Sequence, residues 1–275
     1  MKLLSKIVRY VLDQTVIPVA GYIRYRTYAA VPPYTVQQEL ARRTAAECAD
    51  YVQSEMPKAL QFNKREDVWG YVWEKRKFAG LAAEFGVWNG YSINRIAQKT
   101  NQLVYGFDSF AGLREDWSGG EFAKGKFDMG GKLPAVGENV RLVKGWFDET
   151  LPEFLAEHGE PFAFVHIDCD TYEAAKTILD LLESRILEGT VVVFDEYFGY
   201  RGWRLGEFKA WQEFVLRHEV RYEYLAYCAT QVAVRVTRIA RIGPLQAENG
   251  ENHENHELKQ SETSPLQADT SIIRR

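Results

Sequence analysis

The sequence predicts an α/β protein in which a mostly parallel, seven-stranded sheet is covered by helices on both faces. Three observations support this fold class. Short apolar runs alternate with amphipathic helical patterns from about residue 77 to residue 236, as expected for βαβ units. Acidic residues stand where several of these runs end, and open parallel sheets bind ligands at such strand ends. The last two runs have no helix between them, which predicts an antiparallel hairpin at one edge.

Seven segments have the strand pattern: residues 81–84, 103–107, 140–143, 162–167, 190–194, 222–227 and 231–236. Helices are predicted between most of them, at 92–99, 151–158, 172–187 and 207–217. Thr150 and Glu153 have the spacing of a capping box at the start of the second helix. Residues 36 to about 77 also show a helical pattern, before the first strand.

The composition is that of one globular domain with appendages. Of 275 residues, 46% are hydrophobic and 26% are charged, which is an ordinary balance. We predict a helical appendage at 1–74, a main domain at 75–240 and a disordered polar tail at 241–275. The net charge of -4 gives no support to a nucleic-acid partner. Three widely spaced cysteines, Cys48, Cys169 and Cys228, indicate reduced thiols and a cytoplasmic location.

The N-terminal segment is basic and partly apolar. Residues 1–30 hold five Lys or Arg and one acid, and these charges interrupt every run long enough to span a bilayer. Neither a transmembrane helix nor a secretory signal is predicted. Leu3, Ile7 and Leu12 allow an amphipathic helix that packs on the domain or on a second subunit of a homo-oligomer, with weak membrane-surface contact as the alternative. Residues 31–34, Val-Pro-Pro-Tyr, are interpreted as a stiff linker.

A glycine turn lies in LAAEFGVWNGYS, residues 81–92. The run reads as a strand ending near Glu84, a turn through Gly86 and Gly90, and a helix start. Glycine permits positive φ and the close approach of a ligand. Because no Gly-x-Gly-x-x-Gly run is present, the spacing favours a nucleoside cofactor with a cationic amino-acid end over a dinucleotide. An ordinary strand-to-helix turn is the competing interpretation.

The stretch 109–139 between the second and third strands contains seven glycines and is long for such a connection. Loops of this length in compact domains are usually functional or disordered. Its aromatic residues favour an ordered lid over a floppy insert.

Acidic side chains follow three of the predicted strands. Asp108 ends the second strand, in the position of a ribose-hydroxyl acceptor; Asp168 and Asp170 follow the fourth, and Asp195 and Glu196 follow the fifth. The carboxylates after the fourth and fifth strands, Asp168, Asp170, Asp195 and Glu196, lie at the mouths of adjacent strands and repel one another unless a cation lies among them. An all-oxygen set suits Mg²⁺, Mn²⁺ or Ca²⁺ better than zinc.

Each acid also has a simpler interpretation. Asp170, three residues before Glu173, has the position of a helix N-cap, and Asp195 could end its strand simply by being solvated. His166 alternates in phase with Asp168, so it is interpreted as a buried sheet histidine and not as a base.

Several blocks between about residue 75 and residue 236 resemble the macrocin O-methyltransferase family of S-adenosylmethionine (SAM) dependent enzymes. They are Glu84-x-Gly-x-x-x-Gly90, YGFDSFAGL at 105–113, VRLVKGWFDETLP at 140–152, FVHIDCDTYEAAK at 164–176 and VVVFDEY at 191–197. The resemblance implies a Rossmann-like class I methyltransferase fold. It also implies Mg²⁺-dependent methylation of a hydroxyl on a small molecule, often a sugar of a natural product.

The resemblance assigns expected roles to the matching residues. They are Glu84, Gly86 and Gly90 around the methionine part of SAM; Asp108 at the ribose; Ser109 as a further cofactor-binding residue; Trp146 and Phe147 near the adenine; Asp168, Asp195 and Glu196 at Mg²⁺; and Asp170 as the general base. The third metal position is usually Asp in this family, and the longer Glu196 either shifts the ion or binds it through water. Residues 200–211 match the family only loosely, which leaves the acceptor open.

The expected mechanism is an in-line displacement in which the acceptor hydroxyl lies on Mg²⁺ and Asp170 removes its proton. A catechol or phenol O-methyltransferase is the first alternative, disfavoured because Glu196 and not Asn follows Asp195. A SAM-binding protein without catalysis is the second, disfavoured because all four acids are present.

Overall fold

The structure is a computed structural model that describes residue 12 and residues 18–20, 35–120 and 122–240. Most of the predicted N-terminal amphipathic helix, the linker at 31–34 and the whole predicted polar tail at 241–275 lie outside the described residues. Within the described part of the chain, no helix is long and apolar enough to cross a membrane.

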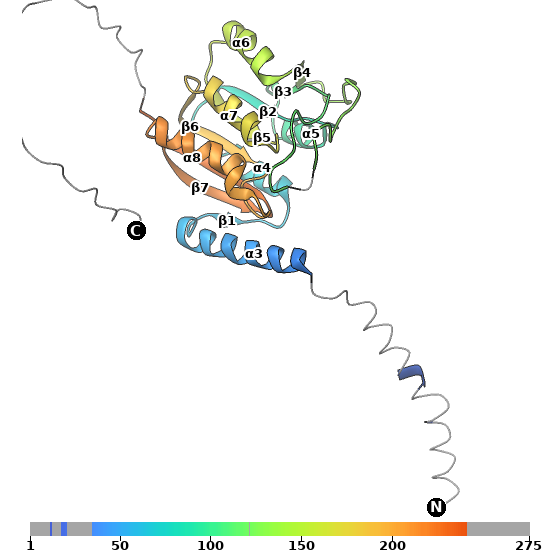
Figure 1. The fold of residues 1–275 in the computed structure, drawn as a ribbon. Coiled ribbons are helices and arrows are strands. Elements are labelled where there is room, and N and C mark those ends of the chain that lie inside the picture. Colours follow the sequence, from blue (N-terminus) through green and yellow to red (C-terminus); the bar gives the residue numbers. More distant parts are fainter. Residues whose placement is uncertain (1–11, 13–17, 21–34, 121, 241–275) are drawn as a thin grey trace, which may run out of the picture. The chain divides into compact units, whose positions relative to one another are not determined.

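An eight-stranded sheet forms the centre of the protein (Figure 1). Its spatial order is β1-β7-β8-β6-β5-β2-β3-β4. The strands are β1 (Leu60–Gln61), β2 (Leu81–Phe85), β3 (Val104–Asp108), β4 (Val140–Lys144), β5 (Phe162–Ile167), β6 (Ile186–Phe194), β7 (Arg221–Cys228) and β8 (Gln231–Arg238).

All seven predicted strands form, but the predicted count was wrong by one. The additional strand, β1, pairs parallel with Ala226 and Tyr227 of β7, so the predicted hairpin of β7 and β8 does not form the outer edge at that point. Two residues are too few to show a strand periodicity, which is why β1 could not be predicted.

The strand directions explain the sequence pattern. Strands β2 to β6 pair parallel, and β8 pairs antiparallel with both β6 and β7. Every residue of β5 is buried, as expected for a parallel strand that is covered on both faces. The parallel strands therefore end at one common edge, where their terminal side chains can meet.

Helices cover both faces of the sheet (Figure 1). They are α3 (Val36–Glu55), α4 (Arg65–Trp73), α5 (Tyr91–Ala97), α6 (Phe147–Glu157), α7 (Tyr172–Leu181) and α8 (Glu207–Arg217), with a short 3-10 helix, η2 (Trp203–Leu205). Buried residues of α6, α7 and α8 belong to one hydrophobic cluster, and those of α4 and α5 belong to the cluster on the opposite face.

The segment before the first predicted strand contributes to the sheet and its core. Both β1 and α4 lie within it, and Trp69 and Val72 of α4 are fully buried. From α3, the Tyr51 hydroxyl hydrogen-bonds to the Tyr224 hydroxyl of β7 at 2.5 Å. Residues 36–73 therefore pack with the strands that follow them.

Two predicted helix boundaries were wrong. Helix α6 begins at Phe147, with Trp146 at the N-cap position, so the predicted capping box does not form. Thr150 lies inside the helix, where its hydroxyl donates to the Trp146 carbonyl at 2.9 Å. Helix α7 ends at Leu181 because the chain enters the sheet at Ile186, as the first residue of a longer β6.

Candidate active site

A cavity of about 640 Å³ opens at the carboxyl ends of the parallel strands. It is lined by strand-end residues, by the starts of α6 and α7 and by parts of the stretch 109–139. Nine of the predicted site residues lie on its wall: Gly86, Asp108, Ser109, Trp146, Phe147, Asp168, Asp170, Asp195 and Glu196. The structure does not bring Glu84 or Gly90 to this wall.

The two glycines of the predicted turn are fixed by contacts within the protein. Gly86 has φ 92°, and a Cβ there would lie 1.7 Å from the Asp168 carbonyl oxygen. Gly90 has φ 81°, and a Cβ there would lie 3.3 Å from Pro134. The missing side chain at Gly86 thus lets the backbone after β5 approach the turn after β2, and this contact helps to shape the cavity wall.

Asp108, the last residue of β3, binds the backbone of the glycine turn that follows β2. Its Oδ2 accepts hydrogen bonds from the backbone amides of Val87 at 2.8 Å and Trp88 at 2.7 Å. Its Oδ1 accepts from the amide of Phe110 at 2.6 Å. A carboxylate offers about four lone-pair positions, so Asp108 keeps acceptor capacity toward the cavity. Its role at a ribose stays a prediction.

An aromatic corner stands beside Asp108. Trp146 precedes α6, and the Arg114 guanidinium lies 4.2 Å above its ring. Arg114 also forms an ion pair with Asp148 at 3.0 Å. Phe147 packs edge-on against the buried Phe85. These contacts hold the two aromatic side chains on the cavity wall, where a planar ring of a ligand can stack against them.

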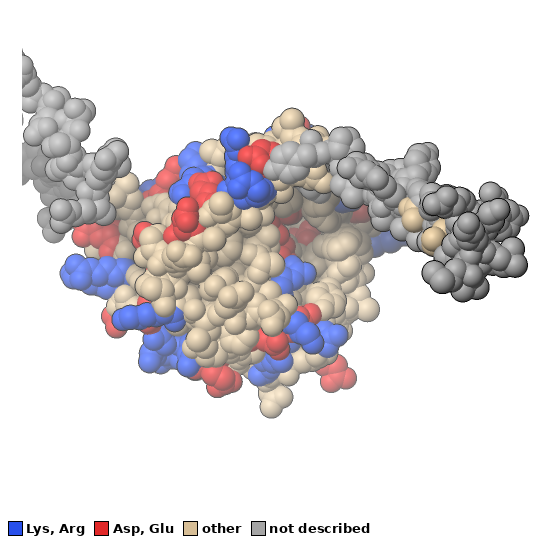
Figure 2. Space-filling view, turned by 90° about the horizontal axis from the view of Figure 1, so that it is seen from below, with Lys and Arg blue, Asp and Glu red and all other residues tan. Residues whose placement is uncertain are grey.

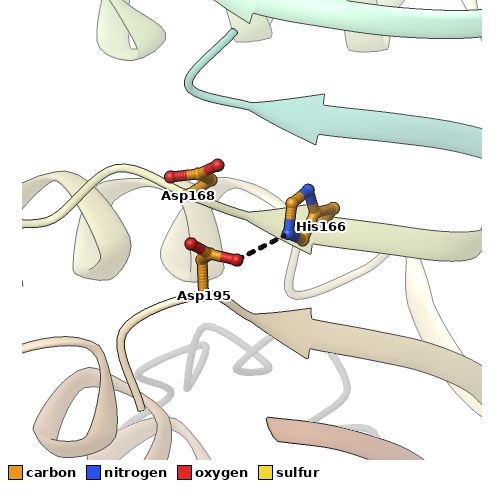
Figure 3. A group of neighbouring side chains, drawn as sticks. All are labelled: His166, Asp168 and Asp195. Atoms are coloured by element: carbon orange, nitrogen blue, oxygen red, sulfur yellow. Dashed lines mark ion pairs between the residues drawn. The ribbon is translucent and has the colours of Figure 1, made fainter. Parts of the chain in front are cut away.

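A row of alternating charges runs from the core to the cavity. The Glu84 carboxylate lies 2.9 Å from Nδ1 of His166, and Nε2 of His166 lies 3.7 Å from Oδ1 of Asp195. Oδ2 of Asp195 accepts a hydrogen bond from Nη1 of Arg65 at 2.5 Å. Figure 3 shows the ion pair between His166 and Asp195 behind the strand ends. We define Glu84, His166, Asp195 and Arg65 as the charge row.

The charge row fixes the protonation of its inner members. Burial lowers the pKa of His166, but Asp195 and Glu84 outweigh it and raise the pKa to about 10. Burial raises the pKa of Asp195, but His166 and Arg65 lower it to about 2. His166 is therefore a buried sheet histidine, as predicted, and it is a cation at neutral pH. It has no proton-accepting nitrogen for a general base.

Three further acids border the cavity without a basic partner of their own among the described residues. Burial, together with the neighbouring Asp195, raises the pKa values of Asp168 and Glu196 well above their ordinary range. The same two causes raise the pKa of Asp170 to about 7. Oε2 of Glu196 is buried and has no hydrogen-bond partner in the described part of the chain. The wall thus holds acidic groups whose ionised forms lack a compensating positive charge.

Asp170 is not the N-cap of α7. Thr171 takes that position, and its hydroxyl oxygen accepts from the Ala174 amide at 3.4 Å. Asp170 has φ 63°, a left-handed conformation that non-glycine residues adopt at a cost and that often marks functional sites. It is only 9% exposed. The backbone therefore holds Asp170 on the cavity wall at some expense in conformational energy.

The acidic wall fits a hard divalent cation. In the described residues, the tightest group of candidate ligands is His166, Asp168 and Asp195, whose ligand atoms lie within 4.8 Å of one another (Figure 3). Protonated His166 cannot ligate, so carboxylate oxygens remain, and Glu196 adds its unpartnered oxygen. Oxygen donors suit Mg²⁺ or Mn²⁺. Arg65 competes with such an ion for Asp195.

The stretch 109–139 packs over the cavity. Trp117, Phe122 and Phe127 line it. The Trp117 ring lies 5.0 Å from the ring of Tyr200, between β6 and α8. Where the stretch meets the same loop, a Cβ on Gly119 would lie 2.2 Å from the Gly202 Cα. The predicted lid is thus packed against the loop after β6, while its movement stays a prediction.

Charges of both signs are interspersed on the face shown in Figure 2. They surround a central area without Lys, Arg, Asp or Glu, and the described residues of this face show no single-sign patch. This distribution agrees with the small net charge and adds no support to a nucleic-acid partner.

Residues 83–197 match the family model described as Methyltransferase domain. A curated relative is the 8-demethyl-8-(2,3-dimethoxy-alpha-L-rhamnosyl)-tetracenomycin-C 4'-O-methyltransferase of Streptomyces olivaceus, at 28% identity over 43% of this chain and 53% of the relative. The match thus spans about half the length of that relative.

The comparison with solved structures found similar chains. Calicheamicin methyltransferase CalS11 has a TM-score of 0.51 at 20% identity, over 75% of this chain and 95% of that one. The O-methyltransferase NovP has a TM-score of 0.47 at 22% identity, over 63% and 80%. The likeness to CalS11 confirms the predicted arrangement of a mostly parallel sheet with an antiparallel pair.

Proposed function

Because residues 83–197 match a methyltransferase domain model and the fold is similar to that of CalS11, we propose that this protein transfers the methyl group of SAM to a hydroxyl of a sugar or glycosylated natural product, with Mg²⁺. One observation supports this most: a strained, buried acid, Asp170, lies on the same cavity wall as Asp168, Asp195 and Glu196. A base and an oxygen-rich cation site in one cavity are what this reaction requires.

The ends of β2 and β3 and the start of α6 form the cofactor half of the cavity. Asp108 and Ser109 accept hydrogen bonds from the ribose hydroxyls, and Trp146 and Phe147 stack on the adenine. Gly86 lines the wall, near the methionine part. Glu84 is buried behind the wall, so it does not contact SAM directly. It supports the methionine part of SAM indirectly through Ser92, whose hydroxyl donates to Glu84 at 3.0 Å.

When bound, SAM supplies an electrophilic methyl group and Mg²⁺ supplies a charge that lowers the pKa of a hydroxyl. Asp168, Asp195 and Glu196 would hold the ion, and Oδ2 of Asp195 would then have to leave its hydrogen bond with Arg65. A carboxylate oxygen of Asp170 accepts the proton of the acceptor hydroxyl. Its raised pKa of about 7 suits this step, because a base works best when its pKa lies near the working pH.

The acceptor half is aromatic. Trp88, Trp117, Phe122 and Phe127 line the cavity, and their rings offer apolar faces for the C–H side of a sugar ring. The curated relative is, by its name, a 4'-O-methyltransferase of a rhamnosyl compound, which supports a glycoside as the acceptor class.

Isothermal titration calorimetry tests the cofactor. SAM and its demethylated product are expected to bind without Mg²⁺, because the residues proposed for SAM are distinct from the metal ligands. Binding of NAD with no binding of SAM would contradict the proposal.

Methyl transfer is tested with labelled SAM, Mg²⁺ and a panel of glycosides, catechols and amines. Mass spectrometry is expected to detect a gain of one methyl group on a glycoside, and EDTA is expected to abolish it. Methylation of catechols alone, or of amines alone, would contradict the proposed acceptor class.

A further inference from the structure

Glu207 is a fully buried acid that the sequence did not single out. It is the first residue of α8 and is 0% exposed. Among the described residues, no basic side chain forms an ion pair with it. A buried carboxyl without a cationic partner is costly unless hydrogen bonds compensate. The positive end of α8 offsets part of this cost, and three hydrogen bonds to the carboxyl oxygens offset a further part.

Two of these hydrogen bonds come from backbone amides of the acidic wall, and the third comes from Sγ of Cys169, at 3.9 Å. Oε1 of Glu207 accepts from the Cys169 amide at 3.3 Å, and Oε2 accepts from the Glu196 amide at 3.1 Å. Cys169 lies between Asp168 and Asp170, and Glu196 directly follows Asp195. One carboxyl group therefore contacts both segments that hold the proposed metal ligands and base.

The register of the sheet shows why this contact matters. Strands β5 and β6 pair with Ile167 opposite Phe194, and their last ladder bond runs from the Asp195 amide to the Ile167 carbonyl at 2.9 Å. Continued by two residues, the same register would place Cys169 opposite Glu196. Instead of a further hydrogen bond between the two strands, the Cys169 and Glu196 amides each donate to the carboxyl group of Glu207.

We infer that Glu207 is a positioning residue, which sets the spacing between the Asp168–Asp170 segment and the Asp195–Glu196 segment by bridging the Cys169 and Glu196 amides. The inference rests on the proposed function for its catalytic meaning. Residues that orient metal ligands typically change metal affinity or activity by about 10- to 100-fold when replaced. Glu207 touches neither cofactor nor acceptor, because it does not line the cavity.

Glu207→Gln is the principal test. The amide oxygen of Gln accepts one backbone N–H, but its NH₂ group is a donor and cannot accept the other. We expect Mn²⁺ affinity, measured by electron paramagnetic resonance titration, to fall about 10- to 100-fold. We expect kcat to fall while the KM for SAM stays unchanged, because the proposed SAM residues lie on other segments.

Glu207→Asp and Glu213→Gln complete the set. Aspartate keeps the carboxyl group, but its shorter side chain reaches only one of the two amides, so partial recovery relative to the Gln variant is expected. Glu213 lies on the same helix and accepts from the Tyr172 hydroxyl at 2.7 Å, outside the cavity. Its Gln variant is expected to retain the wild-type Mn²⁺ affinity and kcat.

Two readouts do not depend on catalysis. In the wild-type protein, amide hydrogen exchange by NMR should show protection at Cys169 and Glu196, and the Gln variant should lose protection at one of them. Crystal structures of both forms should show a changed distance between these two amide nitrogens.

Fast hydrogen exchange at the Cys169 and Glu196 amides of the wild-type protein would overturn the inference. This measurement needs no variant, so it holds even if none of the variants folds. Wild-type Mn²⁺ affinity with retained protection in Glu207→Gln would overturn it as well. A wild-type protein that transfers no methyl group would instead overturn the proposed function, while the exchange and crystallographic results would still decide the role of Glu207.

Discussion

Asp170→Asn separates the proposed base from a structural role. Asparagine matches aspartate in size and tolerates the left-handed backbone, so the φ of 63° at this position is retained. The N-cap of α7 is Thr171, so the substitution leaves the cap in place. The change therefore removes a charge and a proton acceptor and little else.

The expected effect on stability follows from the raised pKa. Burial, followed by Asp195 and Asp108, raises the pKa of Asp170 from 3.8 to about 7. An acid with a higher pKa in the folded state destabilises that state when it ionises. The penalty is absent below about pH 4, grows between pH 4 and pH 7, and is constant above. Its upper limit is about 4 kcal/mol, since each pKa unit corresponds to about 1.4 kcal/mol.

Without a divalent ion, Asp170→Asn should therefore be at least as stable as the wild type at pH 8 and equal to it at pH 4. Its kcat should fall by about 10² or more, with no recovery on adding metal. SAM and Mn²⁺ affinities should change little. In the wild type, kcat should rise as the pH increases through about 7, because the base must lose its proton.

Thermal unfolding at both pH values, calorimetry with SAM and initial rates by mass spectrometry measure these quantities. Asp50→Asn, on the exposed side of α3, is the control. Turnover near the wild-type value would remove Asp170 from the catalytic residues. A variant that is markedly less stable than the wild type at pH 8 would refute the electrostatic argument.

Three further predictions concern the metal site, the lid and a surface ion pair. Arg65→Gln should strengthen Mn²⁺ binding, because the guanidinium no longer competes for Asp195, whereas Asp195→Asn should weaken it; equal affinities in paramagnetic titrations would contradict the competition. Protease cleavage within 109–139 should slow when SAM and an acceptor are added, since closure protects a lid; an unchanged rate would argue against closure. Burial raises the pKa of Asp180, but Lys176 and Arg217 lower it below its ordinary value, so its stabilising effect is present at neutral pH and is lost as the pH falls through the folded pKa. Because solvent screens this exposed ion pair, Asp180→Asn should lower the unfolding free energy at pH 7 by less than about 1 kcal/mol and should leave it unchanged in strong acid. Glu188→Gln, at an exposed position, is the control. An equal loss of unfolding free energy at both pH values would show a cause other than charge.

The main strands and the acidic wall could be predicted because both depend on short-range pattern. Buried parallel strands leave continuous apolar runs, as in β5, and parallel strands end at one edge. That edge brings Asp168 and Asp195 together in the structure as it does in the prediction. The role of Asp170 as an N-cap was open in the sequence, because Thr171 is an equally good cap and only the backbone conformation decides between them.

Contacts between segments that are far apart in the sequence could not be predicted. Arg65 lies in a helical stretch 130 residues from its partner Asp195, and no spacing relates the two. Glu207 looks like an ordinary residue at a helix start, because its two amide partners are 38 and 11 residues away. The position of Glu84 behind the cavity wall also depends on His166, on another strand.

The charge row has a consequence for how this protein can evolve. Replacing a single inner member, His166 or Asp195, would leave a neighbouring charge in the core without its partner, and such a change typically costs about 3–5 kcal/mol. That is a large fraction of the stability of a domain. Exchanging Glu84 and His166 together for apolar side chains avoids the unpaired charge, because Asp195 keeps Arg65 as its partner. Substitutions in the row should therefore arise in coupled pairs, and the row should be inherited as one unit even where the acceptor loops diverge.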